Sequence, residues 1–374
     1  MFLIVSCSST KRFPSDESKE TVKKKTNLNF ASVRVLLDES EATYHITNQS
    51  PMYLFNGEDN LAYIETGNLI ECITQNDEIK LSIQNKIFIA ESFILEPFEN
   101  ENTVSFNGQV YKGKLSLLKI GNSIGIVNHL KLEDYVKGVV TKEMPIGKNY
   151  ENFESLKAFS ICVRTYALNK ILEGKLLYDL YDDTRDQVYG GVNAEHNLSN
   201  KAVEETDNKI LTYNENIASI YYHSTCGGRT EAAHNIFTKK EIPYMNGIED
   251  GISPNCKISP KFEWRESYSA DDIISRLKKW SFIKNGKFRL RDVYIASRFS
   301  SGRVKEMVFE LIDEYSDEIK ISIYGNQIRS VIRTANNKRI LWSTFFDISL
   351  IKNVIKIEGN GFGHGVGLCQ YGAI

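Results

Sequence analysis

Two kinds of hydrophobic pattern alternate along the chain. Short runs such as SVRVLL (Ser32 to Leu37) and KLSIQNKIFIA, with partial alternation of apolar and polar residues, fill residues 32 to about 97 and are typical of β-strands. Asn107-Gly108 and Gly121-Asn122 are hairpin turn signals between further strands. Strand-like alternation returns over residues 291–330, and residues 351–358 predict a strand before a glycine-rich end. We expect an α+β fold with a β-rich N-terminal region.

Between these strand-rich parts, residues 130–171 predict a helix-turn-helix. A first helix should run from Leu132 to about Lys142, because Pro145 moves Met144 away from helical dihedral angles. A second should run from about Asn152 to Leu172, with one apolar face made of Leu156, Phe159, Val163 and Ala167. Glu143 would then end the first helix, where a cleft wall could form. A glutamate at a helix end is most often merely solvated, so this feature alone assigns no chemistry.

Three later segments carry polar and aromatic residues in turn-rich sequence. YDDTRDQVYGG (Tyr181 to Gly191) predicts a loop, either simply solvated or suited to sugar hydroxyls through its carboxylates and aromatic rings. ILTYNENIASIYYHST predicts a hairpin that brings His223 forward, before a tight turn at 226–228. Helices are expected over residues 200–208, 269–279, where Ser269 suits an N-cap, and 326–334.

The glycine-rich end, GNGFGHGVGLCQYGA, is the third segment. It lacks the Gly-Lys-Ser/Thr of a phosphate loop and the strand and helix of a dinucleotide site, so it implies no cofactor. Its glycines allow the backbone to come close to a ligand or to another segment of the chain, and His364 lies between two of them. The segment is either a packed turn in which the ring nitrogens of His364 have hydrogen-bond partners within the protein, or the wall of a cleft in which His364 and Gln370 hydrogen-bond a glycan.

Four motifs in order resemble the sporulation stage II protein D (SpoIID/LytB, amidase-enhancer) family. They are LEDYVKGVV…EMP…ESLKAFSICVRTYAL, YDDTRDQVYGG, AVEETDNKILTYNENIASIYYHSTCGGRTE and GNGFGHGVGLCQYGA, over roughly residues 106–374. The resemblance implies a bacterial cell-wall protein. Some members are lytic transglycosylases acting on peptide-free peptidoglycan strands and forming 1,6-anhydro ends; others are enhancers of an N-acetylmuramoyl-L-alanine amidase. We expect the transglycosylase activity, with the non-catalytic, glycan-binding enhancer as the alternative.

The resemblance also implies the site. Glu143 matches the family's glutamate in Glu-Met-Pro and would be the single acid/base, with a pKa raised by partial desolvation. The expected substrate-binding residues are Arg164, Tyr166, Gln187, Tyr189, His223, Ser224, His364 and Gln370. We expect Glu143, His223 and His364 to line one open groove, the carboxylate lying on the order of 10 Å or less from both histidines. No cofactor is implied.

The sequence departs from the family pattern in two places. The family has a tryptophan shortly after Glu-Met-Pro, where this chain has IGKNYENF with Tyr150 and Phe153. The family also continues beyond QYGA with a helix and a tyrosine-bearing strand, so we expect the end at Ile374 to be truncated.

Composition and cysteine spacing argue against several other classes of protein. A net charge of −2 gives no basic excess for nucleic acid, and no apolar stretch is long enough to span a bilayer. The six cysteines fit no zinc-finger spacing, and no cysteine-hydrolase context surrounds them. Cys162 is expected to be a buried thiol. Some members of the family that this chain resembles bind zinc through one histidine and two cysteines, for which His223, Cys226 and Cys256 are the candidates here. Cys226 and Cys256 could also form a disulfide or stay free, so no residue is assigned as a metal ligand.

The N-terminus predicts export. Ile4-Val5-Ser6-Cys7 has the form of a lipobox, although the apolar segment before it is short for a signal peptide. The polar stretch from Ser8 to Thr26 suits a tether. We therefore expect three regions: a truncated lipoprotein signal and tether (1–26), a β-rich region (27–100), and a SpoIID-like catalytic region (101–374). The protein would be a lipoprotein anchored to the membrane through Cys7, facing the periplasm or cell wall, with glycan strands and possibly an amidase as partners.

Overall fold

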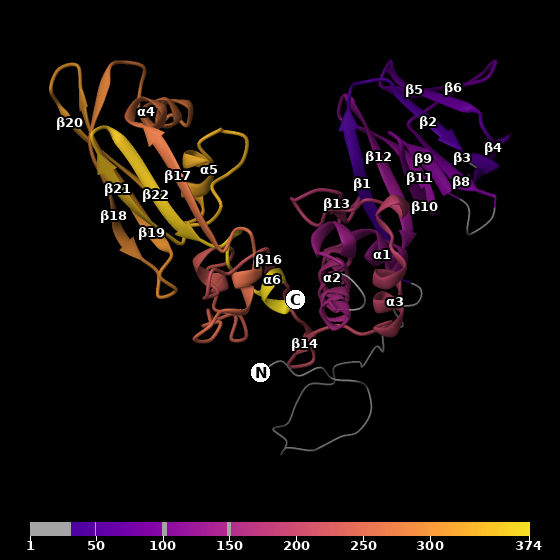
Figure 1. Cartoon of the computed structure of the whole chain (residues 1–374). Helices are drawn as coiled ribbons and strands as arrows, with labels where there is room; N and C mark the ends of the chain where they lie inside the picture. The colour runs from indigo at the N-terminus through magenta and orange to yellow at the C-terminus, as the bar shows by residue number, and fades with distance from the viewer. Residues whose placement is uncertain (1–30, 49, 99–102, 148–150) are drawn as a thin grey trace, which may run out of the picture. The chain divides into compact units, whose positions relative to one another are not determined.

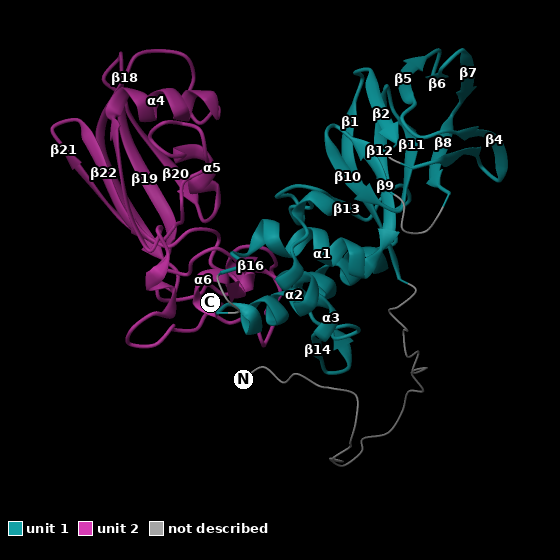
Figure 2. Cartoon of the chain, turned by 45° about the vertical axis from the view of Figure 1, so that its right-hand side comes forward, with its two compact units in different colours: residues 1–220 teal, residues 221–374 magenta. Residues whose placement is uncertain are grey.

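The computed structural model describes residues 31–48, 50–98, 103–147 and 151–374. The chain forms two compact units, Met1–Ile220 and Tyr221–Ile374, and each is described by itself (Figure 2). The α+β prediction is confirmed, and the N-terminal part is rich in strands. Among the described helices, none combines the length and apolar character needed to cross a membrane. Cys7 and the polar tether lie outside the described residues.

Unit 1 is built on two mainly antiparallel sheets that pack against each other (Figure 1). The first has the order β13 (Leu180–Tyr181), β1 (Ser32–Ser40), β12 (Ser123–Lys131), β11 (Lys114–Ile120), β8 (Ser92–Pro97), β3 (Met52–Asn56), β4 (Asp59–Ile64). The second has the order β10 (Gln109–Lys112), β9 (Thr103–Phe106), β2 (Tyr44–Asn48), β5 (Leu69–Gln75), β6 (Glu78–Ile83), β7 (Lys86–Ala90). Strands from both sides of residue 100 pair within each sheet.

The predicted turns join neighbouring strands of these sheets. Asn107 and Gly108, with φ of 49° and 75°, connect β9 to β10, as an Asn-Gly hairpin turn requires. Gly121 connects β11 to β12. The inward-facing residues of the strands are apolar and form the core of unit 1.

Three helices follow the sheets and lie side by side (Figure 1). They are α1 (Leu132–Glu143), α2 (Phe153–Leu172) and α3 (Asn197–Glu205), and a short hairpin of β14 (Thr212–Tyr213) and β15 (Asn216–Ile217) follows. The predicted apolar face of α2 is buried, but so are Ser160, Arg164 and Thr165 on other faces. The reason is that α1, α3 and β13 all contact this helix, so it is enclosed on several sides.

Unit 2 has an apolar core between two three-stranded antiparallel sheets and two helices. One sheet is β17 (Glu263–Ser269), β22 (Val354–Asn360), β21 (Phe346–Ile351), and the other is β18 (Phe288–Arg298), β19 (Val304–Asp313), β20 (Glu318–Tyr324). The helices are α4 (Ala270–Lys279) and α5 (Gln327–Ile332). Ser269 caps α4 by accepting the Asp272 N–H, as predicted.

A smaller part of unit 2 carries the histidines and cysteines. Here β16 (Tyr222–His223) pairs in parallel with β23 (Leu368–Cys369), which precedes the short helix α6 (Gln370–Ala373). The 3-10 turns η3 (Ala233–Asn235) and η4 (Asn255–Ile258) lie in the same unit, and η4 contacts α6. The glycine-rich segment before β23 therefore lies beside the hairpin end at His223.

Candidate active site

The predicted hinge after α1 is present. The helix ends at Glu143, and Met144 is extended, with φ −130° and ψ 134°, because Pro145 disfavours helical dihedral angles before it. The Met144 side chain is buried, whereas Glu143 is half-buried. Glu143 Oε1 accepts a hydrogen bond of 2.8 Å from the backbone N–H of Val188. The carboxylate is therefore oriented by the YDDTRDQVYGG loop, 45 residues away in sequence.

The loop is itself fixed by the two helices. The Tyr166 hydroxyl, on α2, donates to Asp186 Oδ1 at 2.7 Å, and the other oxygen of Asp186 accepts the N–H of Tyr181 at 2.9 Å. The Tyr135 hydroxyl, on α1, donates to Gln187 Oε1 at 3.2 Å. Gln187 is fully buried and lies directly before Val188. These contacts fix the position of the Val188 N–H, which in turn holds the Glu143 carboxylate.

Tyr189 is buried against α1. Its ring packs on Tyr135, with centroids 5.2 Å apart, and its hydroxyl donates to Asn128 Oδ1 at 3.1 Å. A Cβ at Gly138 would lie 2.5 Å from this ring, so the helix can approach the loop only because residue 138 is glycine. Tyr189 thus packs the loop onto the helix.

Asp182, in the same loop, is a perturbed carboxyl that is not among the predicted site residues. Burial raises its pKa to about 6, and the charge of Asp183 acts in the same direction. Its backbone carbonyl accepts the Tyr189 N–H at 2.9 Å. No local sequence signal distinguishes it from Asp183 and Asp186, because its burial comes from tertiary packing.

Arg164 has no exposed side-chain surface. Its guanidinium binds both carboxylate oxygens of Glu133, at 2.6 and 2.7 Å, and donates to the carbonyls of Lys209 at 3.0 Å and Val203 at 3.3 Å. It therefore joins α2 to the start of α1 and to the end of α3. This contact holds the helix that ends at Glu143.

His223 and His364 lie together in unit 2, with ring centroids 5.7 Å apart. His223 Nδ1 lies 3.1 Å from the carbonyl oxygen of Val366, so this nitrogen carries the proton, and its buried Nε2 has no hydrogen-bond partner among the described residues. His364 Nδ1 accepts the Val366 N–H at 3.1 Å. Burial lowers the pKa of His223 well below its usual value and that of His364 to about 3. Both rings are neutral near pH 7.

Comparison with known proteins identifies the family. A family model for stage II sporulation protein (SpoIID) matches residues 121–213, and a domain of unknown function (DUF8618) matches residues 248–367. An uncharacterized protein of Brachyspira hyodysenteriae is 30% identical over 349 residues, which cover 91% of this chain and 86% of that protein. The chain belongs to the SpoIID family.

Two named SpoIID relatives come from Bacillus subtilis. The amidase enhancer is 27% identical over 79% of this chain and 45% of its own length, so the chain spans less than half of that protein. Stage II sporulation protein D is 28% identical over 66% of this chain and 68% of its own length. The family match at 121–213 contains Glu143, both helices of the hinge and the YDDTRDQVYGG loop.

The predicted site residues of this SpoIID family member divide between the two units. Glu143, Arg164, Tyr166, Gln187 and Tyr189 belong to unit 1 and are joined through α1, α2 and the loop. The others, His223, Ser224, His364 and Gln370, belong to unit 2. Their substrate contacts, and the joint groove with Glu143, stay predictions.

The residues after Glu-Met-Pro are described only in part. Tyr150 lies outside the described residues. Phe153 begins α2, and the Lys157 ammonium lies 5.1 Å from its ring centroid. A cavity of about 420 Å³ in unit 1 is lined by Glu133, Lys137, Val203 and neighbouring residues, and none of its lining residues is a predicted site residue.

A possible metal-ligand group lies in unit 2. The sulfurs of Cys226, Cys256 and Cys369 all lie within 4.8 Å of one another, and the three cysteines are free thiols. The sequence suggests Cys226 and Cys256 but not Cys369, because 143 residues separate Cys226 from Cys369 and no spacing rule connects them. The expected buried thiol at Cys162 is confirmed.

Proposed function

We propose that the protein is a peptidoglycan lytic transglycosylase that cleaves peptide-free glycan strands with Glu143 as its only acid/base. The position of Glu143 is the observation that supports this proposal most strongly. Glu143 ends α1 directly before an extended Met144, and the N–H of Val188, from a loop distant in sequence, orients its carboxylate. A carboxyl fixed at a helix end and only half-buried can both hold a proton and reach a ligand.

The proposed reaction needs one carboxyl because the nucleophile belongs to the substrate. Protonated Glu143 donates its proton to the leaving glycosidic oxygen, and the bond from that oxygen to C1 of the muramic acid residue breaks. The C6 hydroxyl of the same sugar attacks C1 and closes the 1,6-anhydro ring. Its proton passes to the Glu143 carboxylate, which restores the starting state. No water is consumed, so the second carboxylate of an ordinary glycosidase is not required.

The surrounding residues have different parts in this proposal. Arg164, Gln187 and Tyr189 are buried, so they position α1 and the loop from within. Tyr166 holds Asp186 and through it the loop. In unit 2, His364 and Ser224 are half-buried and suited to hydrogen-bonding sugar hydroxyls, whereas His223 and Gln370 are buried and would position them from within.

The proposed location is outside the cytoplasm. Peptidoglycan lies there, and the lipobox at Cys7 predicts a lipid anchor that holds the protein at the membrane while the 8–26 tether gives it reach. The polar composition of this tether supports the proposal.

The alternative is a glycan-binding protein that stimulates an N-acetylmuramoyl-L-alanine amidase without cleaving glycan itself. The printed name of one relative, amidase enhancer, favours it. Glu143 distinguishes the two functions, since a binding protein needs no titrating carboxyl at this hinge.

The test uses two substrates in parallel. The full-length protein is incubated with peptide-free glycan strands, and the products are analysed by mass spectrometry for 1,6-anhydro ends. In parallel, intact peptidoglycan is treated with a purified amidase, with and without the protein, and released stem peptides are quantified. We expect anhydro products in the first assay. Stimulated peptide release with no anhydro product would replace the transglycosylase by the enhancer.

A further inference from the structure

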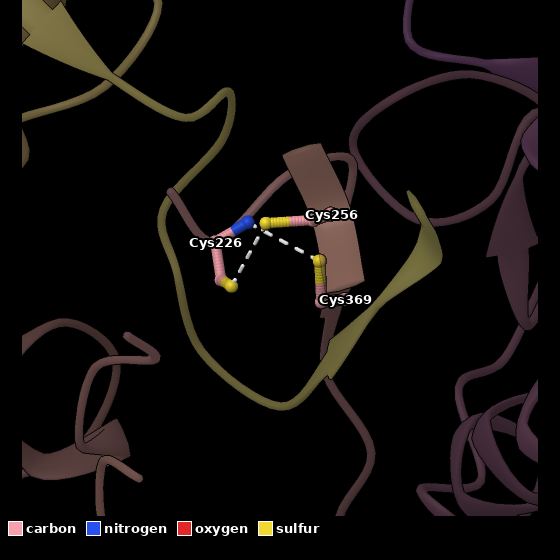
Figure 3. Close-up of side chains that lie close together, drawn as sticks. All are labelled: Cys226, Cys256 and Cys369. Carbon is pink, nitrogen blue, oxygen red and sulfur yellow. Dashed lines mark hydrogen bonds between the residues drawn. The ribbon is translucent and has the colours of Figure 1, made fainter. Parts of the chain in front are cut away.

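Three cysteines from distant parts of unit 2 meet at one point (Figure 3). Cys226 follows β16, Cys256 lies in η4, and Cys369 ends β23. The Cys226 and Cys256 sulfurs are 3.4 Å apart, and all three sulfurs lie within 4.8 Å of one another. Four ligands around a zinc ion at about 2.3 Å would place sulfurs about 3.8 Å apart. The cluster therefore has the size of one face of a tetrahedral metal site.

Backbone N–H groups point at these sulfurs. The Cys226 N–H donates to Cys369 Sγ at 3.2 Å, the Gly228 N–H to Cys226 Sγ at 3.4 Å, and the Gly372 N–H to Cys369 Sγ at 3.3 Å. Hydrogen bonds to a charged group favour its charged form. The N–H groups therefore favour thiolates, which are the form that binds metal.

A buried cation adds to this effect. Arg303 is almost fully buried, and its guanidinium donates to the carbonyl of Cys226 at 2.7 Å and to that of Arg229 at 2.8 Å. Its Nε has no hydrogen-bond partner among the described residues. The positive charge of Arg303 lies close enough to interact with all three sulfurs. Three thiolates around a divalent ion carry a net charge of −1, which this guanidinium would offset.

A carboxylate lies at the edge of the cluster. Asp250 Oδ2 lies 3.6 Å from Cys226 Sγ and accepts the Cys256 N–H at 3.4 Å, while Oδ1 accepts from Asn255. Asp250 is therefore held at the edge of the cluster by its contacts with Cys226, Asn255 and Cys256.

We propose that Cys226, Cys256 and Cys369 form a site for one soft divalent ion, zinc in the first place. Three thiolates select zinc over magnesium or calcium, which prefer oxygen ligands. Each thiol that binds gives its proton to solvent, so binding strengthens as the pH rises. The fourth position is left for water or Asp250. His223 is not part of the group, so the site differs from the His223 and Cys226 pairing considered from the sequence.

The site would have a structural consequence. It joins the hairpin end at 223–228, the turn at η4 and the terminal segment that begins at β23. The glycine-rich segment with His364 runs directly into Cys369, and His223 lies three residues before Cys226, so the ion would fix both segments that carry these histidines. This inference does not depend on the proposed glycan cleavage.

The experiment measures metal in the reduced full-length protein. Protein produced in zinc-containing medium and purified with a reductant is analysed by elemental mass spectrometry, and cobalt is then substituted for zinc. We expect about one zinc per chain and a strong thiolate-to-cobalt charge-transfer absorption, whose intensity falls by about a third in Cys369→Ser. Zinc affinity, measured against a chromophoric chelator, should fall at least about 100-fold in that variant. Cys162→Ala, which removes a buried thiol outside the cluster, should change neither.

A second measurement covers the case in which a variant fails to fold. Wild-type protein is treated with an alkylating reagent with and without prior chelation, and the modified cysteines are located by peptide mass spectrometry. We expect zinc to protect Cys226, Cys256 and Cys369 together, and chelation to remove that protection. Zinc-free reduced protein without a cobalt–thiolate band would overturn the proposal. So would a Cys226–Cys256 disulfide in protein prepared with zinc present.

Discussion

Replacing Arg164 by methionine would separate a structural role from a role in binding substrate. The variant keeps much of the aliphatic volume but removes a fully buried guanidinium that makes two hydrogen bonds to Glu133 and two to backbone carbonyls. Breaking a buried ion pair from one side costs about 3–5 kcal/mol. Glu133 keeps a quarter of its side-chain surface exposed and can be partly rehydrated. We therefore expect a loss of about 3 kcal/mol in the free energy of unfolding of unit 1.

The positions of the tryptophans allow this loss to be assigned to one unit. All three, Trp264, Trp280 and Trp342, belong to unit 2, whereas the two longest helices, α1 and α2, belong to unit 1. Urea unfolding of the full-length protein is followed by far-UV circular dichroism for the helices and by tryptophan fluorescence for unit 2. Arg164→Met should move the helical transition to lower urea and leave the fluorescence transition in place.

Arg185→Met is the matched control. Arg185 pairs with Asp183, but both side chains are about half exposed, so its loss should cost less than about 1 kcal/mol. If Arg164→Met unfolds like the wild type and only weakens glycan binding, then Arg164 contacts substrate, and its assignment as a buried residue that joins α2 to α1 and α3 is wrong.

Three further predictions concern unit 2 and the N-terminus. Burial and neighbouring arginine charges lower the pKa of His364 to about 3 in the folded protein, against about 6.5 in the unfolded chain, so the unfolded chain takes up the proton first as the pH falls. The free energy of unfolding of unit 2 should therefore drop by about 2 kcal/mol from pH 7 to pH 5. Tryptophan fluorescence measures this drop, which should be smaller in His364→Gln. Gly365→Ala should destabilise unit 2 by about 2 kcal/mol or more, because the φ of Gly365 is +86° and the new Cβ would lie 2.5 Å from Arg303 Cζ. The control Gly251→Ala has a similar φ of +71° but open space around the new Cβ, so it should cost only about 1 kcal/mol. Equal losses in the two variants would contradict the steric argument. Cys7→Ala should move the exported protein from the membrane to the soluble fraction, and unchanged fractionation would exclude the lipid anchor.

Local rules predicted the hinge correctly because its cause is local. Pro145 restricts the residue before it, so the end of α1 at Glu143 follows from the sequence alone. The Asn107-Gly108 turn and the Ser269 cap follow from similarly short-range chemistry. Each of these features depends on residues within a few positions of one another.

Long-range contacts were not predictable in this way. The bond from Val188 to Glu143 joins residues 45 apart, and the pairing of Arg164 with Glu133 joins residues 31 apart. Periodicity showed that α2 has an apolar face but not that other elements enclose its polar residues, because that depends on how α1 and α3 pack. Cys369 joins Cys226 only through the pairing of β23 with β16.

The most direct test of the central claim is product analysis with Glu143→Gln. The substitution keeps the shape of the side chain and an acceptor oxygen for the Val188 N–H, but it removes the titrating proton. Wild-type and variant proteins are incubated with peptide-free glycan strands, with Glu154→Gln, an exposed glutamate on α2, as control. We predict that 1,6-anhydro products fall by a factor of at least about 100 in Glu143→Gln while glycan binding remains, and that the control keeps wild-type activity. Undiminished 1,6-anhydro product from Glu143→Gln would contradict the claim and place the acid elsewhere.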